Sequence, residues 1–502
     1  MLYKEYGLRI KMIIKKNPDE FQNYLSDASN YQGTAEAVYW PQSEEEIIEL
    51  VTRCNAEKLR MTVSGNGTGL TGARVPEGGV VISTEKINKV IELNESEKYL
   101  CVGPGMILKD LQDYVEEKIL FYPPDPTERN CFIGATVATN SSGARSFKYG
   151  PTRDYVIGMR GVLPTGQTIS MERGKIFASA YNFSFSTDQG TKYNFSIPQF
   201  KMPKVKNAAG YYCRANMDLI DLFIGSEGTL GIITELKLKL LALEEKILSC
   251  VVFFKSEEDA FNFIDEARTI TKSDSSSEEI KISARGLEFF NKLTLNFLRP
   301  DYPAISENKC SVWFEQELTA HEEELTEYWL KLMKKHNADV KASWMAVNKK
   351  EQEEFKDFRH AIGSRVNEFV ARRGLRKVGT DVAVPDESFF TFYKWMIDLV
   401  ESNNLEYVVY GHFGNCHTHL NMLPRDQADF IQAKKIYSEI CCEAVRLKGT
   451  VSAEHGIGKM KRDYLLLMYG EEVISQMAKL KLIFDPNRIL NIGNIFEEKY
   501  LQ

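Results

Sequence analysis

All seven histidines of this 502-residue chain lie in its second half, and four of them are clustered. His412, His417, His419 and His455 fall within one short stretch, and Glu454 directly precedes the last of them. Two imidazoles and one carboxylate, with one coordination position left open, are the usual ligands of a catalytic divalent metal. The cluster therefore indicates a metal centre, for which zinc is the leading choice, although iron or manganese would accept the same ligands.

A β-hairpin would bring these histidines together. Residues 408–413 and 417–423 flank a Gly-Asn turn, which is typical of a hairpin. Folding back at this turn would return His412 towards His419, and an extended second arm would place His417 and His419 on one face. Because imidazole titrates near neutral pH, a histidine beside the metal could also accept a proton during a reaction.

Three glycine-rich segments in the first half predict that a large ligand lies against the backbone. Residues 64–72 read Ser-Gly-Asn-Gly-Thr-Gly-Leu-Thr-Gly, residues 134–143 contain no large side chain, and residues 223–234 repeat the glycine pattern. Such segments let several backbone N–H groups approach one anion, although each segment alone could be a turn or a site of tight packing. Their spacing fits neither the Rossmann nor the P-loop motif.

The elements that must position these segments are predicted from hydrophobic periodicity and capping residues. We expect strands at 61–64, 80–83, 87–93, 100–102, 156–163, 232–241 and 247–254, and helices at 41–55, 108–117 and 256–268. Residues 171–206 show no clear period, so we expect an insertion or lid that is partly disordered, with a plain surface loop as the alternative. Residues 273–279 are predicted to be a linker, and residues 432–482 mainly helical.

Together, the three glycine-rich segments resemble the FAD-binding domain of the vanillyl-alcohol oxidase and p-cresol methylhydroxylase type, over about residues 35–242. The resemblance implies that FAD binds to Gly65, Asn66, Gly67, Thr68, Gly69, Leu70, Thr71, Pro124, Asp125, Gly134, Ala135, Ala138, Thr139, Asn140, Ser142, Gly143, Glu227, Gly231, Ile232 and Asn491. Asn66 stands where relatives usually carry glycine, and asparagine tolerates positive φ well. Because no histidine precedes His321, a histidyl link to the flavin within this domain is excluded. We expect non-covalent FAD, with a bond to Cys131 as an alternative in principle.

The second half resembles the FAD-linked oxidase family, which includes D-lactate dehydrogenase, the flavin subunit of glycolate oxidase and D-2-hydroxyglutarate dehydrogenase. The resemblance implies that His412, His419 and Glu454 bind the metal and that His455 is the catalytic base. His417 stands where some relatives have asparagine, so we expect it to contact the substrate or to support a metal ligand. The resemblance implies an α+β fold of four parts. These are an N-terminal extension (1–30), a two-subdomain FAD-binding domain (31–244), a substrate or cap domain with the metal hairpin (245–430) and a mainly helical C-terminal segment that completes the active site (431–502).

The reaction implied by the resemblance is oxidation of a D-2-hydroxy acid to the 2-oxo acid, with hydride transfer to FAD. Arg359 and Lys377 are candidates for binding the substrate carboxylate, although such residues are usually solvated on exposed helices. The chain has no haem or iron–sulfur motif, so we expect an external electron acceptor: a cytochrome, an electron-transfer flavoprotein, a quinone or oxygen. The alternatives are a sugar-lactone or aryl-alcohol oxidase on the same domain, and a non-catalytic electron-relay flavoprotein whose metal site is closed by His417.

Composition limits the classes of protein that remain. The chain is 43% hydrophobic and 26% charged, as in globular proteins. A net charge of -7 and a pI near 5.8 argue against a nucleic-acid partner. No apolar run is long enough to cross a membrane, and the first residues lack a signal-peptide core. The nine cysteines are scattered, which favours a reducing compartment. We therefore expect a cytoplasmic protein that could dock peripherally on a membrane and could form a homodimer.

Overall fold

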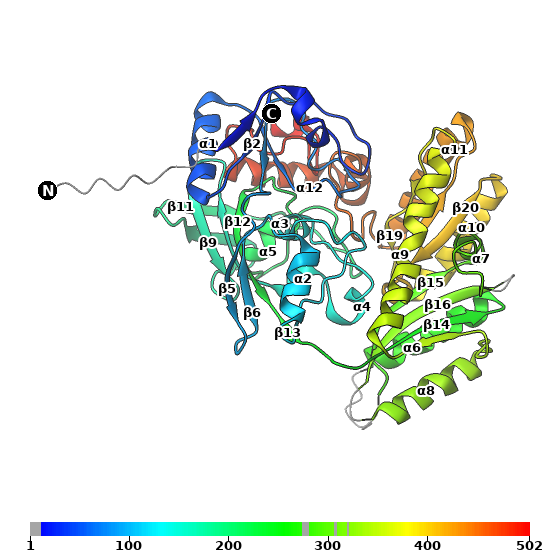
Figure 1. The fold of residues 1–502 in the computed structure, drawn as a ribbon. Coiled ribbons are helices and arrows are strands. Elements are labelled where there is room, and N and C mark those ends of the chain that lie inside the picture. The colour runs from blue at the N-terminus through cyan, green and yellow to red at the C-terminus, as the bar shows by residue number, and fades with distance from the viewer. Residues whose placement is uncertain (1–11, 274–280, 306–308, 319–320) are drawn as a thin grey trace.

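The computed structural model describes residues 12–273, 281–305, 309–318 and 321–502. Two lobes lie side by side in Figure 1, and the chain crosses between them near residue 245. The first lobe holds the N-terminal half together with the last helix, and the second lobe holds the residues between them. Apart from Ser273, the predicted linker at 273–279 lies outside the described residues.

The first sheet of the N-terminal lobe positions the loop 64–72. Its strand order is β1-β2-β4-β3, with β2, β3 and β4 parallel. The strands are β1 (Ile13–Lys15), β2 (Ala37–Trp40), β3 (Met61–Ser64) and β4 (Val80–Ser83). Helix α1 (Glu44–Glu57) buries Ile47 and Val51 in the same core as Met61 and Ile82. The Ser43 hydroxyl accepts a hydrogen bond from the backbone N–H of Glu46, so the predicted cap is confirmed.

The second sheet carries the third glycine-rich segment at the start of its central strand, and the second segment lies in a helix beside it and in the loop that follows. Its order is β5-β6-β12-β8-β9, and all its neighbours are antiparallel. The strands are β5 (Val90–Asn94), β6 (Tyr99–Val102), β8 (Val156–Val162), β9 (Thr168–Glu172) and β12 (Ile232–Lys239), and a short pair is formed by β7 (Leu120–Phe121) and β13 (Leu241–Ala242). The helices beside it are α2 (Leu108–Glu116), α3 (Ile133–Ala138), α4 (Ser146–Tyr149) and α5 (Ile220–Phe223). Because β12 alternates buried and half-buried residues, one of its faces fills the core.

The prediction of a partly disordered insertion at 171–206 is wrong for residues 182–196, which form an antiparallel hairpin. Its strands are β10 (Asn182–Ser186) and β11 (Lys192–Ser196). Phe183 and Phe195 are buried, and Tyr193 stacks on Phe484 of the last helix, with ring centroids 5.6 Å apart. The alternation of aromatic and polar residues in each arm is the period-two signal of a strand, and it was hidden by the polar composition.

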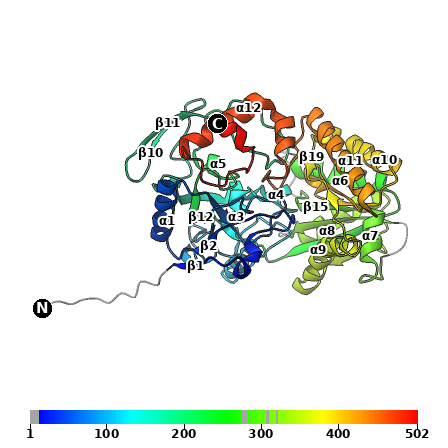
Figure 2. The ribbon, with the colours of Figure 1, turned by 90° about the horizontal axis from the view of Figure 1, so that it is seen from above.

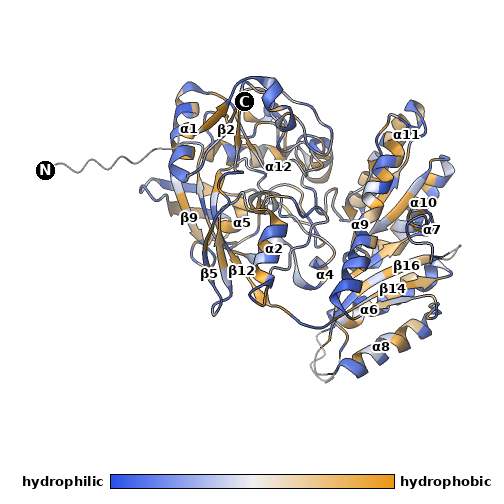
Figure 3. Ribbon diagram, viewed as in Figure 1, coloured by the Kyte–Doolittle hydropathy of each residue, from blue (hydrophilic) through white to orange (hydrophobic). Residues whose placement is uncertain are grey.

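The second lobe is an antiparallel sheet of order β17-β14-β16-β15-β20-β21-β18, with β19 paired to β21. The strands are β14 (Ile247–Phe254), β15 (Ala284–Phe290), β16 (Cys310–Glu317), β17 (Trp344–Ala346), β18 (Val378–Gly379), β19 (Val382–Ala383), β20 (Tyr407–Gly411) and β21 (His417–Met422). The helices are α6 (Glu257–Lys272), α7 (Lys292–Leu298), α8 (Glu322–Lys335), α9 (Lys349–Ala371), α10 (Phe389–Ser402) and α11 (Gln427–Arg446). Helices cover both faces of this sheet, as two neighbouring residues of β14 show, because successive residues of a strand point to opposite faces. Val251 belongs to the same core as α7 and α9, and Val252 belongs to the same core as α6, α8 and α10. In Figure 3 these helices show hydrophobic and hydrophilic residues alternating along their length.

The C-terminal segment connects the lobes, as Figure 2 shows from above. After α11 the chain leaves the second lobe, and α12 (Arg462–Phe484) packs on the first lobe. Leu490 then forms a parallel bridge to Met61, the first residue of β3. The predicted α+β class and the helical tail are confirmed. Among the residues that the structure describes, no helix combines the length and apolar character needed to cross a membrane.

Candidate active site between the two lobes

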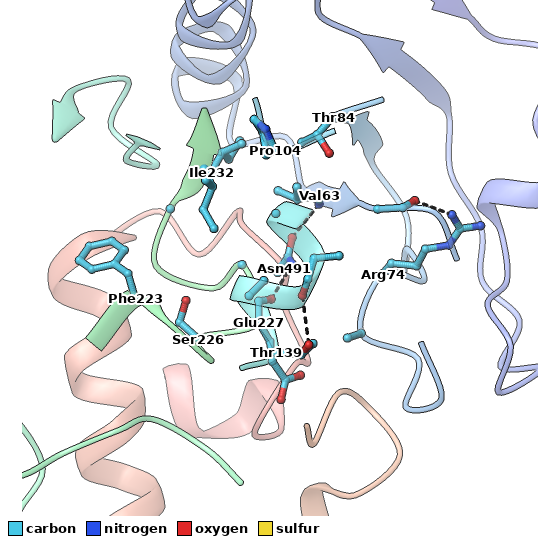
Figure 4. Close-up of a pocket in the computed structure, with 18 of the residues that line it drawn as sticks. Val63, Arg74, Thr84, Pro104, Thr139, Phe223, Ser226, Glu227, Ile232 and Asn491 are labelled. Atoms are coloured by element: carbon cyan, nitrogen blue, oxygen red, sulfur yellow. Dashed lines mark hydrogen bonds between the residues drawn. The ribbon is translucent and has the colours of Figure 1, made fainter. Parts of the chain in front are cut away.

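A cavity lies among the three glycine-rich segments, and it holds about 1070 Å³ of space not filled by protein atoms, a volume that includes solvent at its opening. Figure 4 shows its wall, with Val63 at the end of β3, Thr139 after α3, and Glu227 and Ile232 from the third segment. The segments approach closely: a Cβ atom at Gly65 would lie 2.9 Å from the Cβ of Ala135. Small residues therefore leave room here for a large flat ligand, and backbone N–H groups remain free to bind its anionic parts.

Most of the residues expected to bind FAD line this cavity. They are Gly65, Asn66, Gly67, Thr68, Gly69, Thr71, Gly134, Ala135, Ala138, Thr139, Glu227, Gly231, Ile232 and Asn491. Leu70, Pro124, Asp125, Asn140, Ser142, Gly143 and the alternative thiol, Cys131, are not among its lining residues. Leu70 is 47% exposed, and Asn140 accepts a hydrogen bond from the backbone of Arg153. Ser142 and Gly143 instead lie beside the histidine cluster, as their contacts with Glu454 and Lys206 show.

Arg74 and Asn491 hold the cavity wall in place. The Arg74 guanidinium donates to the carbonyl of Gly65 at 2.8 Å and is the only basic group between residues 64 and 79. Asn491 accepts a hydrogen bond from the N–H of Val63 at 2.8 Å and donates to the carbonyl of Glu227 at 2.9 Å. Asn491 therefore joins strand β3, which leads into the first segment, to the third segment, and Figure 4 shows it between Val63 and Glu227.

The hairpin of β20 and β21 gathers three histidines around Glu454. Tyr410 pairs with His419 across the hairpin, which brings the rings of His412 and His419 to 5.3 Å. The His417 ring lies 4.4 Å from that of His419. Candidate ligand atoms of these histidines and Glu454 all lie within 4.8 Å of one another. Their donor types suit a divalent metal.

Charges around Glu454 keep it ionised. Burial alone would raise the pKa of its carboxyl, but His412, Lys206 and His417 lower that pKa well below its usual value. The Lys206 ammonium forms an ion pair with Glu454 and also donates to the carbonyl of Gly143 at 3.2 Å. A carboxylate that is ionised and surrounded by imidazoles is ready to bind a cation.

His455 belongs to both parts of the site. It lines the large cavity, and its ring centroid lies 5.7 Å from that of His419. Its Nδ1 lies 3.0 Å from Oδ2 of Asp381, so Nε2 is the ring atom left for a ligand. Its side chain is 28% exposed, whereas His417 is fully buried. His455 can therefore reach a molecule that enters between the cavity and the histidine cluster.

The two candidate cations differ in their surroundings. Arg359 is buried, and its Nη2 lies 3.3 Å from Oδ2 of Asp125, while its Nε has no hydrogen-bond partner. It also lies 3.9 Å from Glu288, which contacts His412. Lys377 lies 3.3 Å from the Tyr410 hydroxyl on the hairpin. Arg359 is thus fixed next to the cluster rather than solvated.

The comparisons with known proteins agree with this arrangement. Residues 35–172 match the family model described as FAD binding domain, and residues 245–495 match that described as FAD linked oxidases, C-terminal domain. The chain belongs to the FAD-linked oxidases. It is 31% identical over 481 residues to glycolate oxidase subunit GlcD of Bacillus subtilis, covering 94% of this chain and 92% of that protein.

Two further relatives of this FAD-linked oxidase carry different names. It is 29% identical to D-lactate dehydrogenase of Anaerostipes hadrus (90% of this chain, 88% of that protein) and 28% identical to D-2-hydroxyglutarate dehydrogenase of Stutzerimonas stutzeri (95% of each). A solved structure of 4-ethylphenol oxidase from Gulosibacter chungangensis matches with a TM-score of 0.67 at 16% identity, covering 97% of this chain and 95% of that one. Alkyldihydroxyacetonephosphate synthase also matches at 0.67, with 18% identity, 95% of this chain and 81% of that one. These structures share the fold.

Sequence reasoning missed several side chains that shape the site of this FAD-linked oxidase. Asp381, Glu288 and Lys206 all contact the histidine cluster or Glu454, yet none has a neighbouring motif that marks it. Glu288 stands among Leu287, Phe289 and Phe290, and a charged residue inside such an apolar run is a signal of a buried polar role. Arg74 could have been found as the single basic residue of a glycine-rich loop.

Proposed function

We propose that this FAD-linked oxidase oxidises a D-2-hydroxy acid to the corresponding 2-oxo acid. The observation that carries the proposal is the position of His455, which lines the cavity among the glycine-rich segments and lies beside the histidine–glutamate cluster. The names of the relatives, which specify glycolate, D-lactate and D-2-hydroxyglutarate, support the same substrate class.

The residues of the chain can be assigned to the steps of this reaction. FAD, when bound, would supply a two-electron acceptor for the α-hydrogen; His412, His419 and Glu454 would hold a divalent ion, whose positive charge would make the substrate hydroxyl more acidic. His455 takes the hydroxyl proton on Nε2, and Asp381 stabilises the resulting imidazolium through Nδ1. Arg359 is the better candidate for the substrate carboxylate, because it is buried and its Nε is free to donate.

Anaerobic flavin reduction tests the proposal. The purified protein should be yellow, and D-lactate, D-2-hydroxyglutarate or glycolate should bleach its flavin absorbance, whereas L-lactate should not. If no compound of a broad D-2-hydroxy-acid panel bleaches it, the substrate class is wrong. His455→Ala should abolish bleaching and retain FAD, with His336→Ala as the matched control, since His336 lies at the end of α8 and pairs with Glu266. Unchanged reduction in the His455 variant would reject His455 as the base.

A further inference from the structure

We propose that His417 is a fourth protein ligand of the metal centre, so that three imidazoles and Glu454 hold the ion. The inference rests on the proposed metal centre and adds to it a ligand that a site of two histidines and one glutamate lacks. It follows from the surroundings of His417, from the arrangement of the three histidines, and from the space that remains for a substrate.

The His417 side chain is fully buried, and its Nδ1 has no hydrogen-bond partner. Its Nε2 lies 3.0 Å from Oδ1 of Asp381, so that side of the ring faces an acceptor. Leaving a buried polar group without a partner costs about 1–3 kcal/mol. A ligand on the other side of the ring would remove this cost, and Nδ1 is the atom that points towards Glu454, at 4.0 Å.

The same arrangement is found at His412 and His419, the two expected metal ligands. Each of these rings directs one nitrogen towards Glu454: Nε2 of His412 at 3.1 Å and Nε2 of His419 at 3.6 Å. The opposite nitrogen of each ring faces an acceptor, Glu288 for His412 and the carbonyl of Thr380 at 3.1 Å for His419. Such acceptors fix the tautomer and orientation of metal-binding histidines.

His417 follows this rule with its nitrogens exchanged. Its Nε2 faces an acceptor, Asp381, and its Nδ1 faces Glu454. All three rings therefore surround the same carboxylate, and each has a supporting oxygen behind it. The candidate ligand atoms lie within 4.8 Å of one another, and the side chains would have to move closer together to reach the ~2.0–2.2 Å from a common ion that zinc requires.

Four protein ligands do not close this site to a substrate. Zinc can expand to five ligands, and manganese and iron(II) commonly take six, so one or two positions remain. Since the His455 side chain is 28% exposed and lines the adjacent cavity, it faces the side from which a substrate would enter. These four side chains would therefore leave a position at the ion for a substrate.

X-ray absorption spectroscopy of the zinc-loaded FAD enzyme tests the inference without a variant. Scattering from three imidazoles, together with five or more ligands, is the expected result. Two imidazoles would overturn the assignment of His417 and leave the proposed metal centre intact. Four ligands in total would overturn the open site. A wild-type protein that binds neither zinc nor manganese nor iron(II) would reject the metal centre itself.

Zinc affinity, measured by competition with a chelator, gives a second readout. His417→Asn should weaken zinc binding by about 100-fold or more, as His419→Asn should, because each removes a ligand. His336→Asn is the matched control and should bind zinc like the wild type. Flavin absorbance and circular dichroism show whether each variant folds. A folded His417→Asn protein with wild-type zinc affinity would overturn the inference.

Discussion

The carboxylate of Asp381 holds both the ring and the backbone of His455. Its Oδ2 lies 3.0 Å from Nδ1 of His455 and accepts the backbone N–H of the same residue at 3.1 Å. Lys461 lies 2.7 Å from the same oxygen. Burial would raise the pKa of Asp381, but the charges of His455 and Lys461 lower it well below its usual value. An ionised carboxylate is therefore fixed behind the proposed base.

Replacing Asp381 with asparagine should slow flavin reduction strongly. The amide cannot stabilise the imidazolium of His455 and can favour the wrong tautomer, so we expect a decrease of about 10²–10⁴-fold in the reduction rate. Anaerobic stopped-flow absorbance measures this rate. Asp398→Asn, on the exposed side of α10, is the control and should reduce like the wild type. Reduction at the wild-type rate in Asp381→Asn would show that His455 needs no such support.

Glu227 should make stability depend on pH. Its carboxylate accepts the backbone N–H groups of Ile457 and Gly458 at 2.6 and 2.7 Å, yet burial raises its pKa from 4.5 to about 7. Between these values the folded protein keeps a proton that the unfolded chain has released. Stability therefore falls as pH rises, by about 1.4 kcal/mol per pH unit.

Glu227→Gln removes this dependence, because glutamine does not titrate. Relative to the variant, the wild type should lose free energy of unfolding between pH 4.5 and about 7 and remain level above that range. Urea unfolding of both proteins over this range measures the difference. Glu472→Gln, an exposed site on α12, should show no such change. A difference that is constant with pH would contradict the raised pKa.

Lys206 should compete with a metal for Glu454. Its ammonium pairs with that carboxylate and would repel a nearby cation. We expect Lys206→Met to bind zinc about tenfold more tightly, which corresponds to about 1.4 kcal/mol. Chelator competition measures the affinity, and the exposed Lys204→Met is the control. Weaker zinc binding in Lys206→Met would mean that the lysine supports the ion instead.

Asn491 should contribute to FAD retention. Its side chain joins Val63 to Glu227 in the cavity wall. Asn491→Gly removes both hydrogen bonds, and glycine tolerates the backbone φ of 46° at this position. Two hydrogen bonds of about 0.5–1.5 kcal/mol each correspond to about tenfold weaker FAD binding. Titration of flavin fluorescence measures this, with Asn487→Ala, which bonds to Asn55, as the control. FAD affinity equal to the wild type would exclude Asn491 from the binding wall.

Local sequence patterns determined much of this protein. The capped helix α1, the strand β14 and the hairpin around residues 412–419 follow from short-range periodicity and turn residues, so they could be predicted. The grouping of histidines also followed, because a hairpin folds back over a few residues. The 182–196 hairpin was missed, since its aromatic residues are buried by contact with Phe484, far away in the sequence.

Only the tertiary structure decided how the site is completed. Asp125 was expected at the FAD, but it is buried against Arg359 from the other lobe, and this ion pair cannot be read from either segment alone. Two other contacts could not be read from the sequence for the same reason. Asp381 contacts His455 although 74 residues of chain separate them, and Lys206 contacts Glu454 across 248 residues. Sequence specifies which groups are available. Long-range packing decides which of them lose water and pair, and therefore which can bind a metal or move a proton.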